Sequence, residues 1–251
     1  MVGRSLTPII IRGTGYHWPE GHAHHPLLGE YYSGCKEVVE AHIAWASEYG
    51  IDFFMVSWWG PHTPEEELFR RGLLKFGPLG LVKFAILYES VGRLRGLNRP
   101  EAVRRFLGDA RYLALNYFGH RNYLRIEGRP VLFLYNVYYL YLTFRGDLAG
   151  PLRELRSELK ALGYNVYLVG DVVAPVHPLP LSLLGIRVSL FDAVTSYLFL
   201  LSDNWHFVLK AAKRYYRIWR GYVREHGVAF ILNVYPGFDK TGSKFYRGGP
   251  S

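Results

Sequence analysis

The stretch Lys83–Arg93, KFAILYESVGR, indicates both how this chain folds and where its chemistry lies. Its first six residues are almost continuously apolar. This is typical of a parallel strand covered on both faces, since an antiparallel strand with one wet face would alternate. A carboxylate, Glu89, follows the apolar run directly, and Arg93 comes four residues later. We therefore interpret the stretch as a buried parallel strand with an acidic residue at its carboxyl end.

Comparable apolar runs recur on both sides of this strand, with helical patterns between them. The runs that predict strands lie at residues 8–13, 52–58, 83–88, 130–136, 165–171, 191–197 and 228–235. The patterns that predict helices lie at residues 35–49, 65–75, 99–118, 148–162 and 204–225. We expect Asn98 to cap the third helix, and Gly50 and Gly163 to end the first and the fourth. Residues 175–185, rich in Pro and Leu, predict an irregular loop with a short helix.

Strands and helices alternate along the chain without a break in composition, which favours a single α/β domain over residues 1–251. We predict a TIM-type (β/α)8 barrel, a fold of about 250 residues. Only seven strands are predicted. We therefore expect the barrel to be incomplete at its carboxyl end, or a second copy or another chain to cover its open edge. A doubly wound nucleotide-binding sheet is the less favoured alternative, because no G-x-G-x-x-G follows the first strand and no P-loop is present.

Composition narrows the protein class. The 251-residue chain has a formal net charge of +9 and a single cysteine, Cys35. One cysteine permits no internal disulfide, no apolar run reaches the roughly 18 residues of a membrane span, and the first residues lack a signal-peptide pattern. We therefore expect a cytoplasmic protein without a membrane span. The absence of glutamine and the scarcity of Met and Cys hint at a thermophilic source.

The positive charge gathers on one face of the last predicted helix. The cations that recur there at helical spacing are Lys210, Lys213, Arg214, Arg217 and Arg224. Apolar residues occupy the opposite face, as in a helix packed on a core, so we interpret the cations as a solvated outer surface. No zinc-finger, ribonucleoprotein or heptad motif is present, and we expect no nucleic-acid partner. An affinity for DNA that falls steeply with salt would instead favour a nucleic-acid-binding protein.

The carboxyl ends of the predicted strands carry Tyr or Trp beside polar side chains, and aromatic residues make up 16% of the chain. Active sites of (β/α)8 barrels lie at these ends, and aromatic rings with a polar handle suit the C–H faces of sugars. Glu89 is the predicted catalytic residue, because a carboxylate placed there can act as acid or base, with a pKa set by neighbours such as Arg93. The alternative is a salt bridge that stiffens the loop.

We expect a substrate site assembled from several strand ends. Its predicted contacts are His17, Trp58, Trp59, Tyr88, Arg93, Tyr135, Asp171, Tyr197, Tyr235 and Asp239. Asp52 and Asp192 precede their strands, so they should lie at the opposite end of the barrel, where residues serve stability.

Other reactive side chains carry weaker signals. Four histidines crowd the amino-terminal loop, namely His17, His22, His24 and His25. Their spacing matches no usual metal motif, so we expect no metal and no cofactor. Ser57 lacks the G-x-S-x-G elbow of serine hydrolases, and we expect Cys35 to be buried and inert.

The chain resembles glycoside hydrolase family 99, the endo-α-mannosidase and endo-mannanase group, in short motifs that follow one another in the family's order. The motifs are LLGEYYS (27–33), GIDFFMVSWWGP (50–61), VKFAILYESVGR (82–93), RNYLRIEGRPVLFLYNVY (121–138), FDAVTSYLF (191–199) and VYPGFDKT (234–241). Each is moderately specific, and their succession across nearly the whole chain carries the resemblance. Two positions depart from the family pattern: Lys240 replaces an acidic residue, and Asn136 stands where the family often has Asp.

This resemblance implies a (β/α)8 barrel that binds an oligosaccharide or polysaccharide and hydrolyses α-mannosides with retention and without a metal. In the family, one carboxylate helps the substrate's own 2-hydroxyl to attack, unlike the usual direct attack by a carboxylate, and a second is the general acid. Both belong to an N-E-W-x-E-G motif after the eighth strand, which this sequence does not contain. Two hypotheses follow: a glycoside hydrolase when the missing segment completes it, or a non-catalytic glycan-binding or polysaccharide-biosynthesis accessory protein.

Overall fold

The computed structural model describes residues 27–29, 31–77, 80–174, 178–183, 185–197 and 205–233. The predicted strand at 8–13 lies outside these ranges. So do the four amino-terminal histidines, including His17, and the predicted contacts Tyr235 and Asp239.

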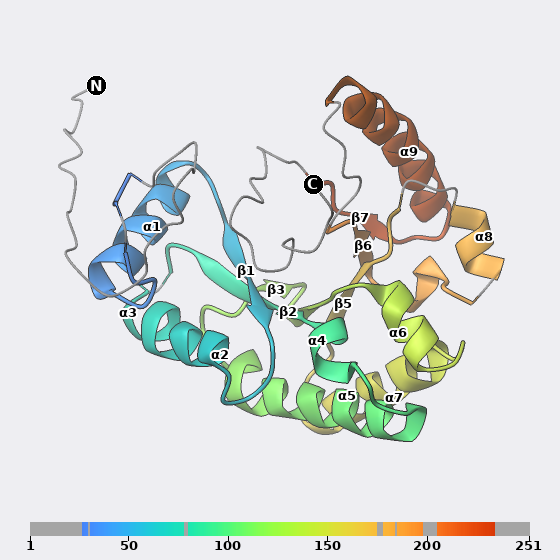
Figure 1. The fold of residues 1–251 in the computed structure, drawn as a ribbon, viewed down its shortest axis with the longest axis horizontal. Coiled ribbons are helices and arrows are strands. Elements are labelled where there is room, and N and C mark those ends of the chain that lie inside the picture. Colours follow the sequence, from blue (N-terminus) through green and yellow to red (C-terminus); the bar gives the residue numbers. More distant parts are fainter. Residues whose placement is uncertain are drawn as a thin grey trace, which may run out of the picture.

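One sheet runs through the described chain, with its strands in the order β1-β2-β4-β5-β6-β7. The parallel strands are β1 (Phe53–Trp58), β2 (Lys83–Tyr88), β4 (Arg129–Leu134), β5 (Tyr167–Asp171), β6 (Ala193–Thr195) and β7 (Ala229–Phe230). A short strand, β3 (Arg125–Ile126), pairs antiparallel with β4. Each parallel strand adjoins the next one along the chain, and β1 and β7 form the edges in the described part. The fold is therefore an open arc of a (β/α) barrel (Figure 1).

Helices link the strands and cover the outer side of this arc (Figure 1). The longer ones are α1 (Lys36–Glu48), α5 (Arg99–Leu113), α7 (Ala149–Ala161) and α9 (Trp205–Glu225). The shorter ones are α2 (Pro64–Leu68), α3 (Leu74–Phe76), α4 (Ser90–Leu94), α6 (Val137–Thr143) and α8 (Pro178–Leu183). A π-helical segment, η1 (Phe69–Leu73), joins α2 to α3, another, η2 (Ala114–Phe118), extends α5, and a 3-10 turn, η3 (Val188–Leu190), precedes β6. The five predicted helices are confirmed, the second and third of them with a π-helical part.

Local signals account for several element ends. Asn98 forms a capping box with Glu101 at the start of α5, as predicted. Gly50 and Gly163 adopt positive φ angles of 74° and 89° just after α1 and α7, a conformation that glycine tolerates best. β4 ends two residues earlier than predicted because Asn136, with a φ of 48°, turns the chain into α6. Neither α4 nor α6 was predicted, since each is too short to show a helical period.

The two faces of the sheet differ by residue parity. Even-numbered strand residues such as Ile86 and Leu132 pack under the helices in the main core. Odd-numbered residues such as Leu87, Phe133 and Val169 form a second apolar cluster, to which no residue of a described helix belongs. Side chains alternate between faces along a strand. We call the odd-numbered side the inner face of the arc, and it leads to the candidate site.

The amino ends of the strands are tied together by Asp192, which precedes β6. Its carboxylate accepts hydrogen bonds from Arg129, Arg156 and the backbone N–H of Leu168, at 2.6 to 2.8 Å. Burial raises the pKa of Asp192, but these bonds outweigh it and leave the pKa lowered. The prediction that Asp192 lies at the stabilising end is confirmed. Cys35, expected to be buried, is only partly so, because it lies just before the first turn of α1.

Candidate functional site

The inner face continues beyond the carboxyl ends of the strands into a group of polar and aromatic side chains. Its members keep the odd parity of the strands that lead to them: Ser57, Glu89, Tyr135, Asp171 and Tyr197. They come from β1, β5 and the segments just after β2, β4 and β6, which neighbour one another in the sheet. The structure thus brings together the predicted residues Glu89, Tyr135, Asp171 and Tyr197 at the end of the barrel where sequence placed the site.

Glu89 is the centre of this group. Its side chain is buried, at 6% exposure, and its Oε1 atom accepts a 2.6 Å hydrogen bond from the Ser57 hydroxyl. Burial raises the pKa of Glu89, the Ser57 hydrogen bond opposes that rise, and the nearby charge of Asp171 adds to it, so the pKa ends above its usual value. A carboxyl group in this state can accept hydrogen bonds when ionised and donate a proton more readily near neutral pH.

Trp59 lies beside Glu89 as a half-exposed aromatic surface. Its indole N–H donates to the Ser57 hydroxyl at 2.9 Å, while 40% of the residue remains exposed. The ring rests on Gly92 of α4, where an added Cβ atom would come within 2.6 Å of indole carbons. Arg93 further fixes this turn by donating to the Trp59 carbonyl at 3.2 Å. The indole is therefore held in one orientation and remains partly exposed.

Asp171 contacts the backbone on both sides of β5. Its Oδ2 atom accepts from the backbone N–H of Asn136 at 3.0 Å, and its Oδ1 atom accepts from that of Tyr197 at 2.8 Å. Burial raises the pKa of Asp171, and these two bonds offset only part of the rise. The rings of Tyr135 and Tyr197 meet edge to face, with centroids 5.1 Å apart and planes at 76°.

A cavity of about 230 Å³ opens on the inner face beneath these groups. Asp171 and Tyr197 contribute to its wall, and apolar side chains from β1, β2 and β4 make up most of the rest. Thr195 and Asn233 add polar atoms, the Thr195 hydroxyl lying 3.1 Å from the Asn233 Oδ1 atom. Sequence reasoning missed Thr195 and Asn233, and considered Ser57 only as a nucleophile. All three have odd residue numbers, which would have indicated that they lie on the inner face.

Three predicted contacts lie on the other face of the sheet. Trp58 and Tyr88 are even-numbered, are each 1% exposed, and donate to Glu66 and Asp109 of the helix layer at 3.1 and 3.0 Å. The Arg93 guanidinium makes two bonds to Asp109, at 2.9 and 2.7 Å, and among the described residues none to the Glu89 carboxylate, although the Arg93 backbone N–H donates to the Glu89 carbonyl. The expectation that Arg93 sets the pKa of Glu89 is therefore wrong, because its guanidinium is turned toward the helix layer.

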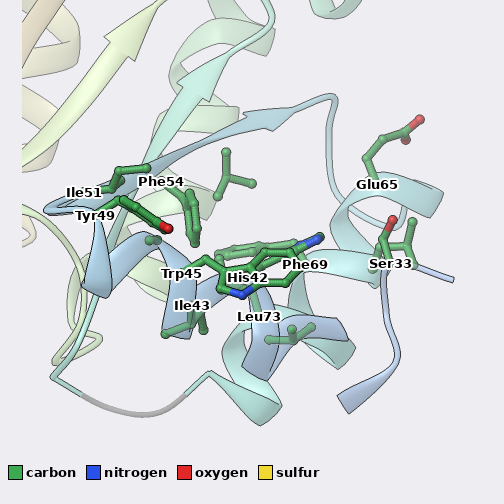
Figure 2. A pocket seen from close by; sticks show the side chains of 14 residues that line it. Ser33, His42, Ile43, Trp45, Tyr49, Ile51, Phe54, Glu65, Phe69 and Leu73 are labelled. Carbon is green, nitrogen blue, oxygen red and sulfur yellow. The ribbon is translucent and has the colours of Figure 1, made fainter. Parts of the chain in front are cut away.

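A larger cavity, of about 550 Å³, lies on the outer face between α1, β1 and the α2–η1 stretch. Figure 2 shows Trp45, His42 and Phe69 in its middle, Tyr49 and Ile51 at one end, and Glu65 at the other. Most of its lining is apolar, and burial lowers the pKa of His42. Because Phe54 and Val56 line it from the even-numbered side of β1, it is separate from the Glu89 group.

Two general findings bear on cofactors and membranes. Within the described ranges, no three His, Cys, Asp or Glu side chains gather as ligands for a metal ion. None of the helices that the structure describes combines the length and apolar character needed to cross a membrane.

No protein-family model matches the sequence, and no curated protein matches it. Solved structures do match. The glycoside hydrolase family 99 endo-α-mannosidase of Bacteroides thetaiotaomicron is 18% identical, with a TM-score of 0.58, over 89% of this chain and 60% of the enzyme. The same enzyme in complex with bis-tris-propane is 20% identical, with a TM-score of 0.60, over 89% of this chain and 64% of the enzyme. A protein described as glycoside hydrolase-like is 21% identical, with a TM-score of 0.63, over 88% of this chain and 69% of that protein.

These similarities show that the chain has the fold of a family 99 glycoside hydrolase, at low sequence identity. The prediction of a TIM-type α/β barrel is confirmed at the level of fold, and the part that the structure describes forms a partial barrel. The chain spans 60% of the length of the Bacteroides enzyme.

Proposed function

We propose that this chain is a glycan-binding barrel of the endo-α-mannosidase type, with Glu89 at the centre of its sugar site. One observation carries the proposal: the buried Glu89 carboxylate, the Ser57 hydroxyl and the half-exposed Trp59 indole form one hydrogen-bonded chain at the carboxyl end of the sheet. This is the end at which (β/α)8 barrels hold their substrates. The fold shared with an endo-α-mannosidase supports α-mannosides as the ligand class.

The geometry suits a sugar ring because it offers an apolar face beside a charged acceptor. The Trp59 indole, supported by Gly92, can stack on the C–H face of a hexose. Its N–H is used by Ser57, and the Ser57 proton is directed at Glu89 Oε1. No hydrogen bond within the described residues engages Glu89 Oε2, so this oxygen can accept a sugar hydroxyl. The Tyr135–Tyr197 pair adds a second aromatic wall.

The same geometry bears on catalysis. Glycosidases generally need two carboxyl groups that are both free to reach the substrate. In the described part, Asp171 is the other carboxylate of the group, and both of its oxygens accept backbone N–H bonds. Glu89 therefore has no free partner there. We expect the described site, in which Glu89 is the only carboxylate with an unengaged oxygen, to bind glycan with little turnover, since loss of one acid or base costs about 10² to 10⁴ in rate.

Calorimetric titration with α-linked manno-oligosaccharides, together with hydrolysis of an aryl α-mannoside, tests this proposal. We expect binding without family-like turnover, and a loss of binding in Trp59→Ala. The matched control is Tyr49→Ala, which removes the ring of a residue that is 78% exposed just after α1, away from the site. Absence of binding by the wild-type chain would reject the proposed function. Turnover at an ordinary glycosidase rate would show instead that the chain is itself a glycosidase.

A further inference from the structure

We propose that Asp171 is a positioning residue, which holds the chain after β4 and the chain after β6 in register so that Tyr135 and Tyr197 form one wall of the site. This differs from its predicted role as a direct sugar contact. The effect on glycan affinity rests on the proposed function above. The pair of hydrogen bonds that Asp171 accepts from the two chain segments, which we call the clamp, can be tested without any glycan.

The placement of the carboxylate explains the clamp. Asp171 is the last residue of β5, which lies between β4 and β6. The ladder between β4 and β5 ends at the Leu134–Gly170 pair, and that between β5 and β6 ends at Asp171–Thr195. Beyond those pairs, the backbone N–H groups of Val172 and Val173 still donate to the Thr195 carbonyl, and the side chain of Asp171 adds bonds from the N–H groups of Asn136 and Tyr197. One carboxylate thus extends the sheet by a further link on each side.

The chain after β4 needs such a link because its conformation is unusual. Asn136 has a φ of 48°, in the left-handed region that few residues other than glycine adopt readily. Its neighbour Tyr135 is held on the β2 side, where its N–H donates to the Tyr88 carbonyl at 3.1 Å and its carbonyl accepts from the Ser90 hydroxyl. Asp171 supplies the support on the β5 side, through the next amide along the chain.

The wall follows from these two bonds. Tyr135 directly precedes the first clamped amide, and Tyr197 carries the second. Their rings then meet at 5.1 Å, although the two residues come from strands on opposite sides of β5. An ionised carboxylate offers acceptors on both oxygens, whereas an asparagine would turn its NH₂ group toward one of the two N–H donors. Asp171→Asn therefore keeps the size of the side chain but removes one of its two hydrogen bonds to the backbone.

The first test is nuclear magnetic resonance of the apo protein. In the wild type, we expect the amide protons of Asn136 and Tyr197 to be shifted downfield and protected from exchange, as bonds to a charged acceptor require. In Asp171→Asn, one of the two should lose its shift, and contacts between the Tyr135 and Tyr197 rings should weaken. Amide signals of ordinary shift and fast exchange in the wild type would overturn the clamp, and this readout applies even if the variant does not fold.

The second test is a double-mutant cycle on the affinity for a manno-oligosaccharide. Asp171→Asn should weaken binding roughly tenfold, the change expected from loss of one charge-assisted bond. In a Tyr197→Ala background, which already lacks half of the wall, the same change should have little further effect. An undiminished loss in that background would show that Asp171 acts directly on the sugar and overturn the proposal.

Asp192→Asn is the matched control, because Asp192 is a partly buried carboxylate that also accepts a backbone N–H, at the other end of the same strands. It should lower the midpoint of thermal unfolding and leave glycan affinity unchanged. An equal loss of affinity in Asp192→Asn would reduce the role of Asp171 to general stability and overturn the proposal. If the wild type binds no glycan, the proposed function fails, and the amide signals alone decide whether the clamp exists.

Discussion

The Ser57 hydroxyl donates a 2.6 Å hydrogen bond to Glu89 and accepts one from the Trp59 indole at 2.9 Å. A small hydroxyl on β1 therefore connects a buried acid that follows β2 to an exposed aromatic ring. Its proton points to the carboxylate, so the acid is held as an acceptor and the ring cannot turn freely. Ser57 therefore influences both the charge of Glu89 and the orientation of the Trp59 ring.

Ser57→Ala should disturb both partners at once. The hydrogen bond from Ser57 lowers the pKa of Glu89 against the effect of burial, so its loss should raise that pKa further. Glycan affinity should fall roughly tenfold, because the Trp59 indole loses the acceptor that fixes its orientation and Glu89 loses the donor that favours its charged form. Carbon-detected resonance of the Glu89 carboxyl group during a pH titration measures the first effect, and calorimetry measures the second. Ser57→Thr, which keeps the hydroxyl, is the control, and a lowered pKa in Ser57→Ala would contradict this account.

Glu89→Gln should stabilise the folded protein at neutral pH. Burial is the main cause of the raised pKa of Glu89, so the fold favours the neutral form. Its stabilising contribution is present below the unfolded-state pKa and is lost as the pH rises through the folded-state pKa. The variant should therefore be more stable than the wild type at pH 7, and this advantage should vanish on acidification below the usual value of 4.5. Urea unfolding across this pH range checks it, and a variant less stable at pH 7 would contradict it.

Glu66 should show the opposite pH dependence. Its buried carboxylate accepts from the Tyr117 hydroxyl, the His62 backbone N–H at 2.7 Å and the Trp58 indole at 3.1 Å. Burial raises its pKa, but these bonds prevail and leave the pKa lowered. The stability it contributes is therefore present above the unfolded-state pKa of about 4.5 and is lost as the pH falls through the folded-state pKa.

The corresponding variant is Glu66→Ala, which leaves these donors without their acceptor in a buried place. We expect a loss of about 3 kcal/mol in the free energy of unfolding at pH 7, shrinking as the wild type is acidified. Glu65→Ala, one residue earlier and exposed in the same first turn of α2, should change stability far less. Equal losses in the two variants would argue that the helix end, and not the buried network, matters.

Gly92→Ala should displace the Trp59 ring, because the new methyl group would lie 2.6 Å from indole carbons. Glycan affinity should fall by an order of magnitude or more, with a shift in tryptophan fluorescence. The control is Gly108→Ala in α5, where a Cβ atom meets nothing within 4 Å. It should stabilise the protein by about 0.5–1 kcal/mol, the difference in helix propensity, and leave binding unchanged. Unaltered affinity in Gly92→Ala would show that the indole does not form the stacking surface.

Much of the fold was predictable because it depends on local periods. Continuous apolar runs located β1, β2 and β5 within a residue or two, and amphipathic patterns located α1, α5, α7 and α9. Glu89 was also predictable as a site residue, since it directly follows a buried strand. The face of the sheet that each strand residue occupies was also predictable, from whether its number is odd or even. Applied to Trp58 and Tyr88, this rule would have placed both under the helices, as the structure does.

The hydrogen-bond partners in the site could not be predicted, because they join residues far apart in the chain. Ser57 and Glu89 are 32 positions apart, and Asp171 lies 35 and 26 positions from the two amides it binds. Arg93 stands four residues from Glu89 yet bonds to Asp109, since α4 turns its guanidinium toward α5. Spacing along the chain cannot show which way a short helix faces.

The sequence by itself determined the alternation of strands and helices and the side of each strand that carries polar groups at its end, because both follow from the periods of the backbone. The tertiary structure alone decided which polar group meets which. The register between neighbouring strands aligned the Ser57 hydroxyl with Glu89. The left-handed turn at Asn136 presented its N–H to Asp171. Hydrogen bonds act only within about 3 Å, so these partnerships form only once the sheet has brought distant strands together.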